Sequence, residues 1–177
     1  PINEFQNCNE KSQSFEVHNR NCGKLVPLWH LVIGILFDVH IMDKRSKEYA
    51  DLKLRYRRRN KYYYNSIESH LRLSIPEGAN ILELGCAAGD TINMLSPYLG
   101  IGVDFNPHLI EQAKKIYPEF QFHCIDLNDV SEFNNFLSKC EKVDYVIISD
   151  LIGTLNDIQI VFELIKSVCH NRTKLIV

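Results

Sequence analysis

Beyond residue 78 the chain alternates between two kinds of hydrophobic pattern. Short continuous apolar runs, such as GIGV (100–103) and VIIS (146–149), are typical of strands buried on both faces. Between them, apolar residues recur at the spacing of helices with one buried face. The pattern predicts strands at 79–84, 99–104, 120–126, 143–149 and 173–177, and helices at 90–95, 107–116, 131–140 and 157–168. Strands joined by such helices require right-handed crossovers, so we expect an α/β fold with a mainly parallel sheet covered on both faces.

The segment that precedes these strands favours a helix from Asp43 to about Leu73. Its apolar positions, Leu52, Ile67 and Leu71 among them, fit a helical period, and the sequence IPEG (75–78) ends the pattern.

The first 41 residues follow neither pattern before Leu25. Met42 resembles a natural start, so we expect residues 1–41 to be an appended element or upstream sequence. The apolar run at 28–42 is shorter than the ~20 residues that cross a bilayer, which favours a buried element over a membrane span. Residues 31–41 are rich in β-branched and aromatic side chains, but they lack clean alternation, and we expect the edge of the strand at 173–177 to stay bare.

Composition narrows the class of protein without identifying it. The 177 residues are 45% hydrophobic and 24% charged, which is typical of one globular domain. A net charge of −2 gives no general attraction to nucleic acid or to acidic lipid. The six cysteines are scattered without the C-x-x-C spacing of a zinc or redox site, so we expect no metal and a reducing, cytoplasmic location.

Candidate chemistry gathers in the segment ILELGCAAGDT (81–91), where the first strand meets the first helix after it. Gly85 and Gly89 let the backbone turn tightly and approach a ligand, and the start of the helix offers free N–H groups to a carboxylate. The G-x-G-x-x-G fingerprint of dinucleotide sites does not fit this spacing. Glu83 adds an acid two positions before the first glycine.

This segment resembles motif I of the class I methyltransferases that use S-adenosylmethionine (SAM), with Ala87 where the family has its middle glycine. The resemblance covers about residues 66–177. It implies SAM as cofactor and a three-layer Rossmann-like sandwich, here with five of the usual seven strands. It further implies a helical lid over the cofactor at 42–75 and a methyltransferase core at 76–177 that is incomplete at its C-terminus.

The resemblance also assigns cofactor-binding positions. It implies that Asp104, which ends the second strand, accepts from the ribose hydroxyls, and that Asp126, which ends the third, accepts from the adenine amino group. Either acid could instead cap the helix that follows it. Phe105 could lie against adenine or simply pack. The expected cofactor-binding residues are Glu83, Gly85, Cys86, Ala87, Gly89, Asp104, Phe105, Asp126, Leu127 and Ser149.

The acceptor side is less defined by the sequence. In the family the end of the fourth strand faces the transferred methyl group, so Asp150 is the candidate catalytic residue, with a loop carboxylate or helix cap as the alternative. The pattern N-P-P-Y of enzymes that methylate nucleic-acid bases is absent there. A basic run at 55–61 followed by three tyrosines could grip a nucleic acid, but a solvated helix face with tyrosines over the cofactor explains it better.

The leading hypothesis is therefore a methyltransferase that acts on a small-molecule or carrier-linked acceptor. A non-catalytic SAM- or nucleotide-binding module remains open, because Ala87 and the early end of the chain would suit it. An NAD(P)-linked oxidoreductase is disfavoured by the spacing of the glycines.

Overall fold

The computed structural model describes residues 43–149 and 151–177. The helices are α2 (Lys47–Arg59), α3 (Lys61–Ser74), α4 (Asp90–Leu95), α5 (Pro107–Ile116), α6 (Val130–Leu137) and α7 (Ile158–Ile165), with short 3-10 turns η1 (Ile152–Thr154) and η2 (Lys166–Val168). The strands are β1 (Asn80–Leu84), β2 (Leu99–Asp104), β3 (Gln121–Cys124), β4 (Val143–Ile148) and β5 (Cys169–Ile176).

The five strands form one sheet in the order β3-β2-β1-β4-β5, and every neighbouring pair is parallel. The predicted Rossmann-like α/β fold is confirmed. The chain runs outward from β1 through β2 to β3 and then crosses to β4 on the other side of β1. Ligands of such sheets bind outside the carboxyl ends of the strands at this reversal, so the fold itself points to the ends of β1 and β4.

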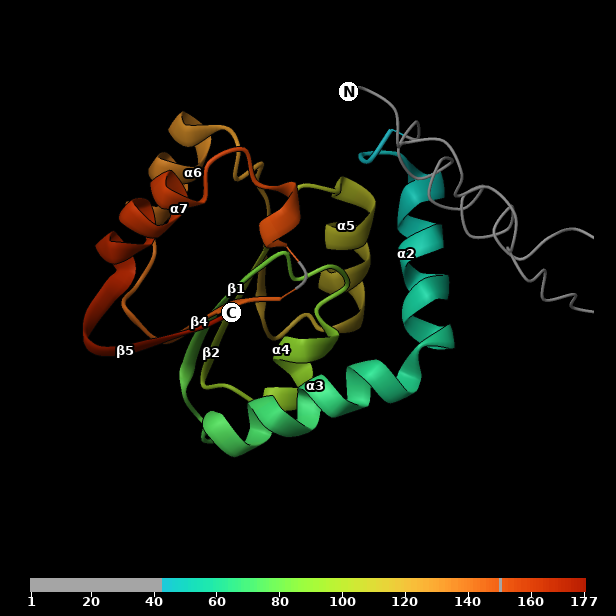
Figure 1. The fold of residues 1–177 in the computed structure, drawn as a ribbon, viewed down its shortest axis with the longest axis horizontal. Helices are drawn as coiled ribbons and strands as arrows, with labels where there is room; N and C mark the ends of the chain where they lie inside the picture. The colour runs from blue at the N-terminus through green and yellow to red at the C-terminus, as the bar shows by residue number, and fades with distance from the viewer. Residues whose placement is uncertain (1–42, 150) are drawn as a thin grey trace, which may run out of the picture. The chain divides into compact units, whose positions relative to one another are not determined.

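Helices cover both faces of the sheet, as Figure 1 shows for α6 and α7 on one side and α3, α4 and α5 on the other. Successive strand residues serve opposite faces: Leu82 packs with α6 and α7, whereas Ile81 packs with α3 and α4. Phe133 and Leu137 of α6 are almost fully buried against the first face. Continuous apolar strands are the sequence signature of this two-sided burial.

The structure corrects several element boundaries, and two of these differences are the largest. The single helix expected over 43–73 is two helices, because the chain bends at Asn60 and the Asn60 side-chain amide donates to the Tyr56 carbonyl. Asparagine competes in this way with the helical backbone, and it favours helix ends. Strand β5 begins at Cys169, four residues before the predicted start, and its pairing with β4 shifts register between Val143 and Tyr145. The polar sequence HNRT (170–173) lacks the apolar pattern of a buried strand, so the start of β5 could not be predicted from the pattern.

Three predictions fall outside the described residues. They concern the character of residues 1–41, the pairing of 31–41 with the last strand, and the position of Asp150. Among the described residues, no strand pairs with the outer edge of β5, and no helix there is long and apolar enough to cross a membrane.

Candidate functional site

Two adjoining cavities open at the carboxyl ends of the strands, and we call them together the cleft. The first has a volume of about 300 Å³ and the second about 110 Å³. They share Tyr49, Gly85, Asp104, Phe105, Leu151 and Thr154. Helices α2 and α3 contribute one wall of the second cavity, through Arg57, Tyr64 and Ile67 among others. The combined space is of the size that binds a small molecule or cofactor.

The loop between β1 and α4 forms the floor of the cleft. Gly85 and Gly89 have φ values of 79° and 82°, a region open mainly to glycine. Ala87 also has a positive φ, 48°, and its N–H donates to Asp104 Oδ2 at 3.0 Å. The left-handed conformation costs a residue with a side chain roughly 1–2 kcal/mol, so this hydrogen bond helps to hold alanine where the family has glycine.

Glu83, at the end of β1, is buried and lines the second cavity. Burial raises the pKa of its carboxyl group to about 8, against smaller lowering effects from the hydrogen bond with Thr91 and the charge of Arg57. Its Oε2 atom has no hydrogen-bond partner within the part of the chain that the structure describes. A buried carboxyl oxygen without a partner is costly, and such a group in a cleft indicates a ligand donor.

Asp104, at the end of β2, connects two loops beneath the cleft. Its carboxylate accepts from the Ala87 N–H and, at 2.9 Å, from the Asn106 N–H. Burial raises the pKa of this carboxyl, and these backbone hydrogen bonds lower it. The helix cap that Asp104 could have supplied comes from Asn106, whose side chain accepts from His108 and Leu109 at the start of α5. Asp104 therefore keeps acceptor capacity for a ligand.

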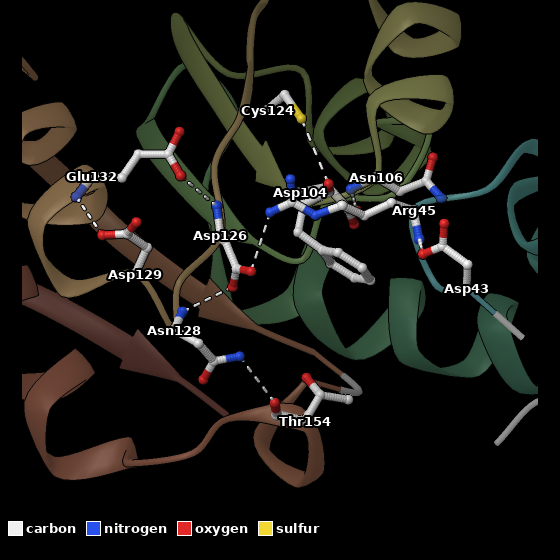
Figure 2. Close-up of polar contacts among 11 residues, drawn as sticks. Asp43, Arg45, Asp104, Asn106, Cys124, Asp126, Asn128, Asp129, Glu132 and Thr154 are labelled. Carbon is white, nitrogen blue, oxygen red and sulfur yellow. Dashed lines mark hydrogen bonds and ion pairs between the residues drawn. The ribbon is translucent and has the colours of Figure 1, made fainter. Parts of the chain in front are cut away.

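Asp126, whose polar contacts Figure 2 shows, follows β3. It lines the first cavity. Its Oδ1 accepts from the Asn128 N–H, while its Oδ2 forms an ion pair with Arg45 at 3.2 Å. It does not cap the next helix, because Asp129 accepts from the first N–H groups of α6.

The other expected cofactor residues divide into two groups. Phe105, Leu127, Cys86 and Ser149 line one or both cavities. Phe105 lies beside Tyr49, with ring centroids 6.4 Å apart. Burial holds the pKa of the Cys86 thiol well above its usual value, which makes a nucleophilic role unfavourable. Gly89 lines neither cavity and instead packs against Phe122.

The basic run is not a uniform phosphate-binding face. Arg57 turns inward and forms ion pairs with Glu68 at 2.7 Å and with Asp90 at 2.9 Å, so it joins α2, α3 and the start of α4. Its guanidinium also lies 4.5 Å from the centre of the Tyr64 ring. Tyr62, by contrast, is 91% exposed. The interpretation as a solvated helix face therefore holds for part of the run.

Sequence reasoning missed Arg45, Asn106 and Arg57 as organising residues of the site. Asn106 was detectable as a helix cap just before Pro107, a common pairing. The partners of Arg45 and Arg57 are distant in sequence, and only the fold brings them together. No group of three or more potential metal ligands occurs in the described ranges.

This chain is similar to known methyltransferases in sequence and in structure. A family model described as a methyltransferase domain matches residues 75–177. A protein from Methanococcus maripaludis assigned as a SAM-dependent methyltransferase has a similar structure, with a TM-score of 0.59, 17% identity, and coverage of 76% of this chain and 64% of that one. The plantazolicin methyltransferase BamL, solved with S-adenosylhomocysteine (SAH) and a substrate analogue, has a TM-score of 0.55 at 25% identity, covering 71% and 49%. The chain thus spans about half to two thirds of these structures. No curated protein sequence matches it.

Proposed function

The chain belongs to the class I methyltransferase domain family, and from that premise we propose that it transfers the methyl group of SAM to a small-molecule or carrier-linked acceptor. The observation that carries the proposal is the buried Oε2 of Glu83, which has no hydrogen-bond partner among residues 43–149 and 151–177. It lies at the inner end of a cleft whose other end holds Asp126. Between them lies Asp104. Three carboxyl groups at the ends of consecutive strands match, in order, an ammonium group, a ribose and an adenine amino group, all of which donate hydrogen bonds.

The residues present fit this cofactor. Glu83 would accept from the amino group, and the free N–H groups at the start of α4 suit a carboxylate. Asp104 would accept from the ribose, Asp126 from adenine, and the Leu127 N–H would donate to the ring. When bound, SAM supplies a methyl group that is already activated by its sulfonium. The chain's own residues then have to bind, orient and exclude water.

Asp104→Ala is expected to weaken SAH binding about 10- to 100-fold, which corresponds to the roughly 1.5–3 kcal/mol lost with hydrogen bonds to a charged group. Calorimetry measures the affinity, and thermal unfolding without ligand reports how far the two loops held by Asp104 have loosened. Asp51→Ala is the matched control, because Asp51 is an exposed acid of α2 outside the cleft. Unchanged affinity in Asp104→Ala would remove the ribose assignment.

The acceptor would occupy a third cavity, of about 500 Å³, between α3 and the ends of β4 and β5. This cavity shares Ile67 and Ser149 with the cleft, so it adjoins the proposed cofactor site. Among the described residues, which do not include Asp150, its lining consists of apolar side chains, a tyrosine, serines and His70, and it holds no lysine, arginine, aspartate or glutamate. A lining of this kind favours an uncharged acceptor and argues against a nucleic acid, which needs basic partners.

Asp150 remains our candidate for the acceptor-side residue, because it directly follows Ser149 in the sequence. Asp150→Asn is expected to lower turnover at least tenfold while SAH affinity stays within about twofold, the pattern of a group that acts only in the reaction. The assay is transfer from labelled SAM to a panel of uncharged metabolites. Equal loss of turnover and of SAH affinity would place Asp150 in cofactor binding instead. SAH binding without transfer to any acceptor would favour the non-catalytic module.

A further inference from the structure

A side chain from outside the motif segments contacts Asp126 at the end of the cleft proposed to bind adenine. Arg45 precedes α2, and its guanidinium bridges to Asp126 Oδ2 at 3.2 Å (Figure 2). Both residues line the first cavity, together with Asp43 and Lys44. The ion pair therefore joins two walls of the same cavity.

Hydrogen bonds from a buried side chain fix the backbone on both sides of Arg45. Asn106, which is fully buried, donates from its side-chain nitrogen to the carbonyl oxygens of Lys44 at 2.8 Å and Ser46 at 3.1 Å. The Asp43 carboxylate accepts from the Arg45 N–H at 2.9 Å, and the Ser46 hydroxyl caps α2. Since both flanking residues are anchored, the side chain of Arg45 can leave Asp126 without movement of this segment. The side chain itself is more than half exposed.

Each carboxylate oxygen of Asp126 already accepts one hydrogen bond, and the Arg45 guanidinium on Oδ2 lines the cavity through which adenine would approach. Oδ1 holds the turn through the Asn128 N–H, and Oδ2 holds Arg45. A new donor at the adenine position competes more readily with Arg45, because an exposed ion pair contributes little and a backbone turn is part of the fold. The two donors are also unequal in charge, so added salt weakens the guanidinium contact more than a contact to a neutral amino group.

We propose that Arg45 is a positioning residue that competes with the cofactor: its guanidinium occupies Asp126 Oδ2 in the free protein and must give way to the amino group of the incoming adenine. This proposal rests on the proposed function, since it takes Asp126 as the adenine acceptor. It predicts that one exchangeable contact occupies the adenine acceptor in the free protein, and that removal of this contact strengthens cofactor binding.

The test is calorimetric titration with SAH, whose own net charge is near zero, at low and high sodium chloride. Arg45→Gln is expected to bind SAH about two- to fivefold more tightly than the parent at low salt, the range for loss of an exposed ion pair. Salt should tighten binding to the parent and leave Arg45→Gln unchanged. Arg59→Gln is the matched control, because it removes the same charge from an exposed position that lines neither cavity of the cleft.

A double-mutant cycle separates competition from a general effect on the fold. Asp126→Asn keeps an acceptor oxygen for adenine but removes the ion pair, so Arg45→Gln should add no further gain in its background. Weaker SAH binding by Arg45→Gln would show that Arg45 holds the cofactor, and unchanged affinity would show that the ion pair is irrelevant to binding; either result overturns the proposal. A parent protein that binds no SAH at either salt concentration would instead refute the proposed function.

Discussion

Gly89→Ala is expected to destabilise the protein by about 3 kcal/mol or more and to lower its unfolding temperature by roughly 10 °C. Two independent costs coincide at this position. The φ angle of 82° is strained for alanine. A Cβ atom would also lie 2.5 Å from Cζ and 2.7 Å from Cε1 of Phe122, a ring that is almost fully buried.

Three other glycines allow each cost to be measured separately. Gly78 has a φ of 76°, and no atom of the described residues lies within 4 Å of an added Cβ. Gly78→Ala should therefore show the backbone cost alone, about 1 kcal/mol. Gly102 has ordinary backbone geometry, but a Cβ there would lie 2.7 Å from Phe122, so Gly102→Ala should show only the steric cost, about 1–3 kcal/mol. Gly153→Ala has neither conflict and should change stability by less than about 0.5 kcal/mol.

Phe122→Leu removes the ring atoms Cζ and Cε1, which the Cβ atom of Gly89→Ala would otherwise contact. The double substitution should therefore be less destabilising than the sum of the single ones, by an interaction energy of about 1 kcal/mol. Chemical denaturation of all variants at one pH measures these differences. If Gly89→Ala proved no worse than Gly78→Ala, the contact with Phe122 would contribute nothing, and Gly89 would be required only for its backbone conformation.

Gly89 also shows what the sequence could not supply. The spacing of Glu83, Gly85 and Gly89 predicted a cofactor loop, and the structure places that loop at the reversal of strand order. The same spacing could not show that Gly89 faces away from the cleft, because its neighbour Phe122 belongs to β3, more than thirty residues later. Local patterns encode local turns, whereas the reason for a small residue lies in the packing of distant elements.

The strands were predictable for a related reason. Their burial on both faces leaves continuous apolar runs. The helices begin at residues typical of caps, Asn106, Asp129 and Asp157, although the sequence suggested Asp104 and Asp126 for two of these positions. The break between α2 and α3 at Asn60 was not predictable from apolar spacing, because the spacing continues across it. Arg45 carried no signal in the sequence, and Arg57 belonged to a basic run interpreted as a solvated helix face in preference to a nucleic-acid contact. The roles of both residues depend on partners 81 and 33 positions away.

The second large effect concerns Glu83, where stability and cofactor binding should respond in opposite directions. Its pKa of about 8 in the folded protein lies above the ordinary value of 4.5, chiefly because burial disfavours the charged form. A raised acid pKa contributes stability below pH 4.5 that is lost as the pH rises toward 8. Between pH 5 and pH 8 the parent should therefore lose on the order of 3 kcal/mol of unfolding free energy through this one group.

Glu83→Gln has no charge to bury, so its stability relative to the parent should rise by on the order of 3 kcal/mol from pH 5 to pH 8. Any fixed cost of placing an amide in the site cancels in that comparison. Denaturation at several pH values measures it, and Glu77→Gln, at an exposed acid, is the control that should leave the pH dependence unchanged. If the difference in unfolding free energy between Glu83→Gln and the parent did not change from pH 5 to pH 8, Glu83 would be ionised over this whole range. Water would then have to solvate its carboxylate in the cleft.

Binding should show the converse, because the amino group of SAH favours the ionised carboxylate. In the parent, SAH affinity should rise by up to about tenfold per pH unit between pH 6 and pH 7.5, and binding should release a proton into the buffer. Calorimetry in two buffers of different ionisation enthalpy detects that proton.

Glu83→Gln should bind SAH more weakly at pH 7.5 and release no proton, because the amino group of SAH then meets an amide that cannot ionise. A buried polar group that binds a ligand is expected to destabilise the ligand-free protein and to stabilise the complex. Proton release that persists in Glu83→Gln would assign the titration to another carboxyl, with Asp104 the next candidate, because burial raises its pKa as well.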